Sequence, residues 1–136
     1  MIVLDASVVV KWFSEEEYTD KALQIRERFL KGEESIIIPD LLLYELANAL
    51  RYNRDFNSTD VKDAIASIFD MHIDIIVPIS KLMSSAITLA FDHNITIYDA
   101  FYVALAKESD LSLITADDGL YKRTSELNLV KFIVDI

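Results

Sequence analysis

The sequence of 136 residues contains no cysteine and only two glycines and two prolines. The lack of cysteine excludes disulfides and thiolate metal sites, and it is compatible with a reducing cytosol. Because glycine and proline are scarce, we expect short loops and few flexible hinges. No apolar run reaches membrane-spanning length before a charge interrupts it, and residues 1–5 lack the features of a signal peptide. We therefore expect a cytoplasmic protein with no membrane partner.

Basic residues are also scarce. The chain has 13 Lys and Arg against 23 Asp and Glu, which gives a formal net charge of −10. Proteins that bind nucleic acid usually contact phosphates through a basic face, so this composition by itself argues against such a partner. Two divalent cations would reduce the net charge to about −6 and could contact phosphate where a basic patch is missing. An acidic protein also favours a basic partner.

Hydrophobic residues make up 52% of the chain, which excludes intrinsic disorder. The length fits a single domain, residues 1–136, with a sizeable core. Short apolar runs rich in β-branched residues alternate with longer segments of helical periodicity. The runs predict strands at residues 2–4, 36–38, 75–77, 111–114 and 130–134. Because these strands are apolar on both faces and separated by helices, we predict a three-layer α/β/α sandwich around a mainly parallel sheet of about five strands.

Four acidic residues lie where this fold would bring them to one edge of the sheet. Asp5 follows the first predicted strand and Asp117 follows the fourth. Glu45 lies early in the apolar helix 41–52, and Asp99 opens the helix that leads into the fourth strand. In an open parallel sheet, sites form beyond the carboxyl ends of the strands. Four carboxylates gathered there repel one another unless a cation lies among them, so the pattern predicts divalent-metal chemistry.

Some of these acidic residues also have an ordinary structural explanation. Asp5 fits a turn or cap before a helix, and Asp99 fits a helix N-cap. Glu45 fits a solvent-facing stripe that it would share with Asn48 and Tyr52. Each explanation holds singly, but together they require independent coincidences of placement.

The pair Asp117 and Asp118 precedes Gly119, and Asp-Gly pairs favour turns. Asp118 fits the turn role better, which would leave Asp117 free for chemistry. The spacing alone allows either residue to be a metal ligand. Taken with the other three acidic positions, the pattern favours a joint metal site.

The acidic residues lie in four longer stretches, residues 3–13, 42–50, 98–106 and 113–117. These stretches resemble, in order and over essentially the full length, the PIN-domain family and specifically the VapC-type toxins of type II toxin–antitoxin pairs. The resemblance implies a metal-dependent ribonuclease that uses Mg²⁺ or Mn²⁺, forms a homodimer and is blocked by a small antitoxin protein. The family's acidic positions would fall on Asp5, Glu45, Asp99 and Asp117.

The resemblance also implies supporting residues. They are Ser7 after the first acid, Asn48 beside the helical Glu, Thr115 before the last acid, and Asp118 as a candidate extra ligand. Oxygen ligands independently favour Mg²⁺ or Mn²⁺ over zinc. We expect Asp5, Asp99 and Asp117 to contact the metal directly or through water, and Glu45 to hold or deprotonate the attacking water. The hydroxyls would orient carboxylates or bound water.

Basic residues near the expected site are few. Arg51 and Arg54 follow Glu45 by one to two helical turns and could meet RNA phosphates. An equally good explanation is a solvated helix end, where positive charge is favourable.

Other functions were weighed against the nuclease. The chain has no Gly-x-Gly-x-x-Gly and no Walker loop, which disfavours nucleotide binding. A phosphoacceptor receiver would need an acidic pair near the first strand and a late Lys, and neither is evident. Two alternatives stay open: an RNA-processing nuclease outside a toxin–antitoxin pair, and a non-catalytic binding module of the same fold.

Overall fold

A computed structural model describes residues 1–136. Its centre is one parallel sheet of five strands in the order β3-β2-β1-β4-β5. The strands are β1 (Ile2–Leu4), β2 (Ile36–Pro39), β3 (Asp74–Ile76), β4 (Ser112–Thr115) and β5 (Val130–Phe132). The sandwich and the number of strands predicted from the sequence are confirmed.

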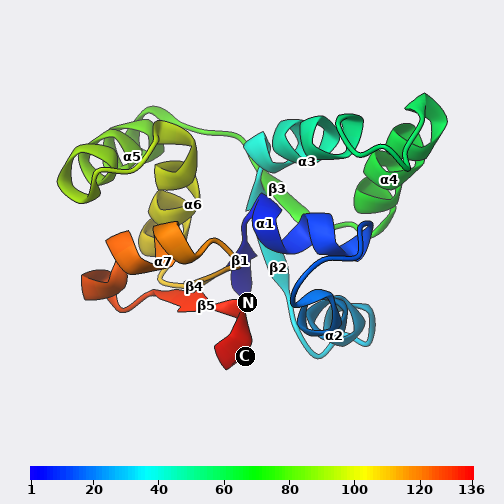
Figure 1. Ribbon diagram of the computed structural model, residues 1–136. Coiled ribbons are helices and arrows are strands. Elements are labelled where there is room, and N and C mark those ends of the chain that lie inside the picture. Colours follow the sequence, from blue (N-terminus) through cyan, green and yellow to red (C-terminus); the bar gives the residue numbers. More distant parts are fainter.

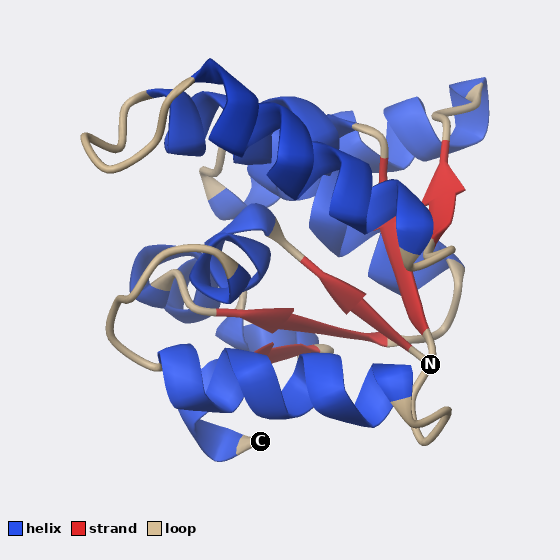
Figure 2. Cartoon of the chain, turned by 90° about the vertical axis from the view of Figure 1, so that its right-hand side faces the viewer, coloured by secondary structure: helices blue, strands red, loops and turns tan.

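Seven α-helices surround the sheet. They are α1 (Ala6–Val9), α2 (Thr19–Leu30), α3 (Leu41–Arg51), α4 (Ser58–Asp70), α5 (Ser80–His93), α6 (Ile97–Glu108) and α7 (Asp118–Arg123). Three short 3₁₀ turns follow β-strand or helix ends, at Val10–Trp12, Ser125–Leu127 and Ile133–Asp135. The helices α5, α6 and α7 lie on one side of the strands and α1 to α4 on the other (Figure 1). Figure 2 shows the twisted strands enclosed between these helices.

Burial on both faces explains why the central strands are continuously apolar. Val3 of β1 pairs with Ile37 of β2 and with Leu113 of β4, and all three side chains are buried. The helix α6 packs against β1, β2 and β4. It does so through small residues such as Ala100 and Ala104, which allow the helix to approach the sheet closely.

The chain changes its direction across the sheet between β1 and β4. From β1 it proceeds through β2 to the edge strand β3, and it then returns to add β4 and β5 on the other side of β1. The connections that leave β1 and β4 therefore diverge to opposite faces, and open α/β sheets form their sites beyond such strand ends. Asp5 comes directly after β1, and Thr115 is the last residue of β4.

Several element boundaries differ from the sequence-based expectation. The bounds of β2, β3, β4 and α3 differ by one residue. The last strand ends at Phe132 and not at residue 134, because Ile133–Asp135 turns into a 3₁₀ turn whose first side chain, Ile133, is fully buried. The helix α6 begins at Ile97, two residues before Asp99. None of the helices combines the length and the apolar character that crossing a membrane requires.

Candidate metal centre

Asp5 is buried at the carboxyl end of β1. Its side chain is only 4% exposed, and it caps α1 by accepting the backbone N–H of Val8 on Oδ1 at 3.3 Å. The hydroxyl of Ser7 also donates to Oδ1 at 2.5 Å, and the hydroxyl of Thr115 donates to Oδ2 at 2.5 Å. The cap explanation for Asp5 is therefore correct, but it accounts for only one of three bonds.

The two hydroxyls join the ends of β1 and β4. Ser7 Oγ accepts the backbone N–H of Ala116 at 2.8 Å, and Thr115 Oγ1 accepts the backbone N–H of Asp117 at 3.0 Å. Each hydroxyl thus donates to Asp5 while it receives a bond from the segment after β4. This arrangement fixes Asp5 relative to Asp117 and agrees with the orienting role expected for Ser7 and Thr115.

Asp99 lies in the first turn of α6 and is half-buried. The helix is capped by Thr96, whose Oγ1 accepts the backbone N–H of Asp99 at 3.0 Å. The explanation of Asp99 as an N-cap is therefore wrong. Because Thr96 supplies the capping oxygen, the Asp99 carboxylate is not needed as the acceptor that caps α6.

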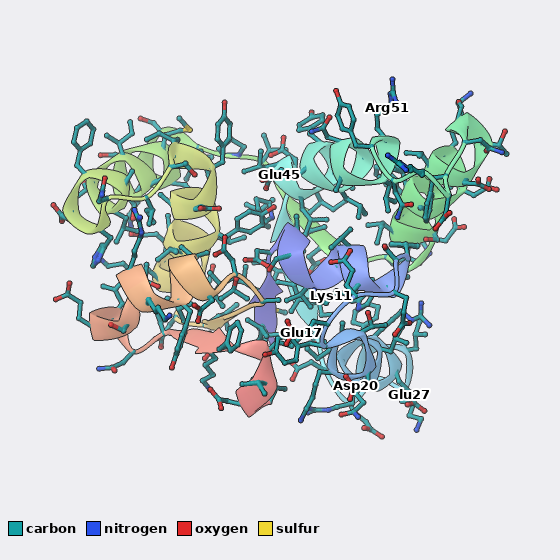
Figure 3. All side chains as sticks on the ribbon, viewed as in Figure 1. Lys11, Glu17, Asp20, Glu27, Glu45 and Arg51 are labelled. Carbon is teal, nitrogen blue, oxygen red and sulfur yellow. The ribbon has the colours of Figure 1, made fainter.

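Glu45 lies in α3 and is half-buried, and Figure 3 shows it near the end of this helix that faces α6. Its Oε1 accepts a hydrogen bond of 2.6 Å from the hydroxyl of Tyr102 in α6. The solvent-stripe explanation for Glu45 is therefore wrong. The sequence analysis did not single out Tyr102 and therefore missed this contact. The one available indication was the spacing of three between Asp99 and Tyr102, which puts both on one helix face.

The pKa values of Asp5, Glu45 and Asp99 are raised. Burial raises the pKa of Asp5 to about 6, against the opposing hydrogen bonds from Ser7, Thr115 and Val8, and the charge of Asp99 adds to the rise. Burial also raises the pKa of Glu45, and Asp99 again contributes. The pKa of Asp99 itself is raised by burial and by the charge of Asp117. Asp99 is thus the electrostatic centre that links the four carboxylates.

None of the four carboxylates forms an ion pair with a basic side chain. No three acidic groups are already close enough together to enclose an ion. The donor set nevertheless fits a hard divalent cation, because it consists of oxygens alone and because a positive charge would relieve the repulsion centred on Asp99.

Asp117 and Asp118 have different partners. Asp117 caps α7, since its Oδ1 accepts the backbone N–H of Leu120 at 3.1 Å, and its Oδ2 has no donor within the chain. Asp118 is exposed and pairs with Lys122 at 2.7 Å. The capping bond therefore belongs to Asp117, and its second oxygen is still available to a metal. Participation of Asp118 as an extra ligand stays a prediction, and it would require Lys122 to move.

Three other residues expected near the site lie outside the network. Asn48 is exposed, one helical turn beyond Glu45. Arg51 points outward from the far part of α3 (Figure 3), and its guanidinium lies 5.2 Å from the ring centre of Tyr52. Arg54 is exposed and forms no ion pair. The structure thus brings neither arginine to the carboxylates.

Comparison with known proteins gives consistent matches. The family model described as PIN domain matches residues 2–126. Ribonuclease VapC3 of Pyrobaculum aerophilum is 28% identical over 131 residues, which cover 90% of this chain and 93% of that protein.

Solved structures share the fold at lower identity. A toxin–antitoxin complex from Klebsiella pneumoniae superposes with a TM-score of 0.74 at 16% identity, covering 98% of each chain. VapC20 of Mycobacterium tuberculosis, described as a sarcin-ricin loop cleaving toxin, superposes with a TM-score of 0.70 at 14% identity, covering 90% of this chain and 94% of that one.

Proposed function

The chain belongs to the PIN domain family, and on that premise we propose that it is a metal-dependent endoribonuclease, the toxin of a type II toxin–antitoxin pair. The observation that carries the proposal is the electrostatic coupling of four carboxylates, none with a basic partner, at the carboxyl edge of β1 and β4. The similarity to a protein named as a ribonuclease supports the same activity.

Asp5, Asp99 and Asp117 would hold a divalent cation, Mg²⁺ or Mn²⁺. A carboxylate offers about four lone-pair positions, and Asp5 uses three of them for Ser7, Val8 and Thr115. The remaining position on Oδ2 is available to the ion. When bound, the cation would offset negative charge at the scissile phosphate and ease the loss of a proton from the attacking water.

Glu45 would accept that proton. Its raised pKa makes it a better base than an exposed carboxylate. Ser7 and Thr115 hold Asp5 in one orientation, so the ligand that lies deepest is also the most rigid.

The RNA substrate would contact the protein mainly at the sheet edge where the carboxylates hold the cation, because the chain is otherwise predominantly acidic. We propose that Arg51 and Arg54 contact phosphates of RNA nucleotides that flank the reacting phosphate. A cellular RNA substrate implies that the reaction takes place in the cytoplasm.

A cognate antitoxin would bind away from the sheet edge. An open groove of about 820 Å³ runs between α3 and α4, and most of the residues that line it are apolar. Its members include Phe56, Val61, Ile65 and Phe69, with Arg51 and Lys62 at the same groove. Such a groove suits a short amphipathic segment of a partner protein. The similarity to a chain of a toxin–antitoxin complex supports this partner class.

We also propose a homodimer. Four apolar side chains are exposed at intervals of four residues and form a stripe, defined by the N-cap residue Ile79 and by Met83, Ile87 and Phe91 of α5. Phe91 is 84% exposed. A continuous apolar stripe of this kind is typical of an interface between subunits.

RNA cleavage tests the proposed function. The arms are wild type with Mg²⁺, wild type with EDTA, and Asp99→Asn with Mg²⁺, with Asp70→Asn as a control at an exposed position of α4. We expect cleavage only by the wild type with Mg²⁺ and by the control variant. Equal cleavage in all arms would rule out the nuclease and favour a non-catalytic binding module, which the net charge of −10 also favours. A small DNA-binding protein encoded next to this gene would separate a toxin from an RNA-processing nuclease.

A further inference from the structure

Tyr102 is a buried tyrosine whose hydroxyl lies within the site. Its side chain is 1% exposed, and it stands three residues after Asp99 on the same face of α6. The ring fills core space, while the hydroxyl reaches across to Glu45 of α3. One helix thus supplies both the central carboxylate and a donor to the neighbouring carboxylate.

The bond fixes one oxygen of Glu45. The Tyr102 hydroxyl donates to Oε1 at 2.6 Å, and no other residue of the chain donates to Glu45 through a side chain. A hydrogen bond to a charged oxygen is stronger than one between neutral groups. A free Glu side chain populates several rotamers, and ordering it has an entropic cost. With Oε1 held, Oε2 is left for an outside partner.

Tyr102 acts on Glu45 as a hydrogen-bond donor. Burial raises its pKa far above the ordinary value, and the neighbouring charge of Glu45 raises it further. The phenol therefore keeps its proton at any working pH, so it can neither take up the proton of the attacking water nor act as a metal ligand in its ionised form. The role that remains for the Tyr102 hydroxyl is to hold Glu45.

We propose that Tyr102 is a positioning residue that holds Glu45 through Oε1 and so directs Oε2 toward the attacking water. This inference rests on the proposed function, because it assigns the purpose of the contact within RNA hydrolysis. The contact itself, and its effect on the orientation of Glu45, are independent of any substrate.

Kinetics of Tyr102→Phe test the proposal, since phenylalanine keeps the ring in the core and removes only the hydroxyl. We expect kcat for RNA to fall on the order of tenfold, as for loss of a hydrogen bond to a charged group, with KM unchanged. Tyr121→Phe is the matched control: its ring stacks on Phe132 at 5.6 Å, its hydroxyl has no hydrogen-bond partner in the chain, and we expect wild-type kinetics.

A double-mutant cycle separates positioning from packing. If Tyr102 acts through Glu45, adding Tyr102→Phe to Glu45→Gln lowers the residual rate no further. A loss of the same size in both backgrounds would overturn the proposal, because the hydroxyl would then act independently of Glu45. Wild-type kcat in Tyr102→Phe would overturn it as well.

A measurement without activity completes the test. In the metal-free protein at pH 8, the ¹³Cδ resonance of Glu45 is expected to move toward the position of an exposed glutamate in Tyr102→Phe, and to stay unchanged in Tyr121→Phe. An unchanged resonance in Tyr102→Phe would contradict the proposal. If the wild type cleaves no RNA, the proposed function fails, while this resonance still decides whether Tyr102 holds Glu45.

Discussion

Thr115 and Asp5 are 110 positions apart in the chain, yet the Thr115 hydroxyl donates to Oδ2 of Asp5 at 2.5 Å. The same hydroxyl accepts the backbone N–H of Asp117 at 3.0 Å. Thr115 is fully buried at the end of β4, next to the carboxyl end of β1. One hydroxyl therefore couples two of the proposed metal ligands, and the pairing of β1 with β4 determines the geometry of the site.

Thr115→Val tests this coupling, because valine keeps the shape and removes the hydroxyl. The change leaves the Asp117 N–H without its acceptor and Asp5 Oδ2 without its donor, so we expect a loss of about 1–3 kcal/mol of unfolding free energy. We also expect weaker Mn²⁺ binding by calorimetry. Thr124→Val is the control, since Thr124 is equally buried but donates to the carbonyl of Leu120, away from the carboxylates. Equal Mn²⁺ affinity in the two variants would count against the coupling.

The stability of the metal-free protein should depend on pH through Asp5. The pKa of Asp5 rises from 3.8 to about 6 on folding, so the folded state binds this proton more tightly than the unfolded chain. The resulting stabilisation is present below about pH 4 and is lost as the pH rises through 6. Its full size is about 3 kcal/mol, of which about 1 kcal/mol falls between pH 5 and pH 8.

Urea unfolding in EDTA at pH 5 and pH 8 measures this contribution. Between pH 5 and pH 8, we expect the free energy of unfolding of the wild type to fall by about 1 kcal/mol more than that of Asp5→Asn. The comparison with Asp5→Asn removes the contribution of titrating groups that do not interact with Asp5. An identical pH dependence of the two proteins would show that Asp5 is not the group responsible.

Removing the charge at the centre of the repulsion should stabilise the metal-free fold. In Asp99→Asn, both Asp5 and Glu45 lose a like-charged neighbour. We therefore expect the free energy of unfolding to rise by about 0.5–2 kcal/mol while activity is lost, a trade-off that is common at functional sites. Thermal unfolding in EDTA checks the gain. Added Mn²⁺ should raise the melting temperature of the wild type and leave that of Asp99→Asn unchanged. Destabilisation by Asp99→Asn would mean that its carboxylate has a structural duty.

The apolar stripe on α5 predicts a dimer. A charge at its centre, Ile87→Glu, should convert the protein to a monomer, because the carboxylate would be buried without a partner. Light scattering after size exclusion measures the mass. Thr88→Glu is the control on the adjacent polar surface, and it should stay dimeric. A monomeric wild type, or a dimeric Ile87→Glu, would contradict the proposal.

Much of the site followed from the sequence because it depends on strand ends. The buried runs at residues 2–4 and 111–114 predicted β1 and β4, and a residue after a parallel strand must lie at the carboxyl edge. The positions of Asp5 and Asp117 were therefore predictable to within a residue. Glu45 was predictable as far as the helix that carries it.

The roles of individual groups could not be predicted, because they depend on which of several donors reaches a given acceptor. Both Thr96 and Asp99 are acceptable caps for α6, and only the backbone geometry selects Thr96. Asp117 and Asp118 pose the same ambiguity at α7. Tyr102 belongs to the core by composition and by burial, and its hydroxyl partner comes from another helix.

The most direct measurement is the anomalous density of a crystal soaked in saturating Mn²⁺. The account predicts a peak between Asp5 and Asp99, within ligand distance of both carboxylates directly or through one water, and no such peak in Asp99→Asn. A wild-type crystal that shows no manganese between these two residues would contradict the account.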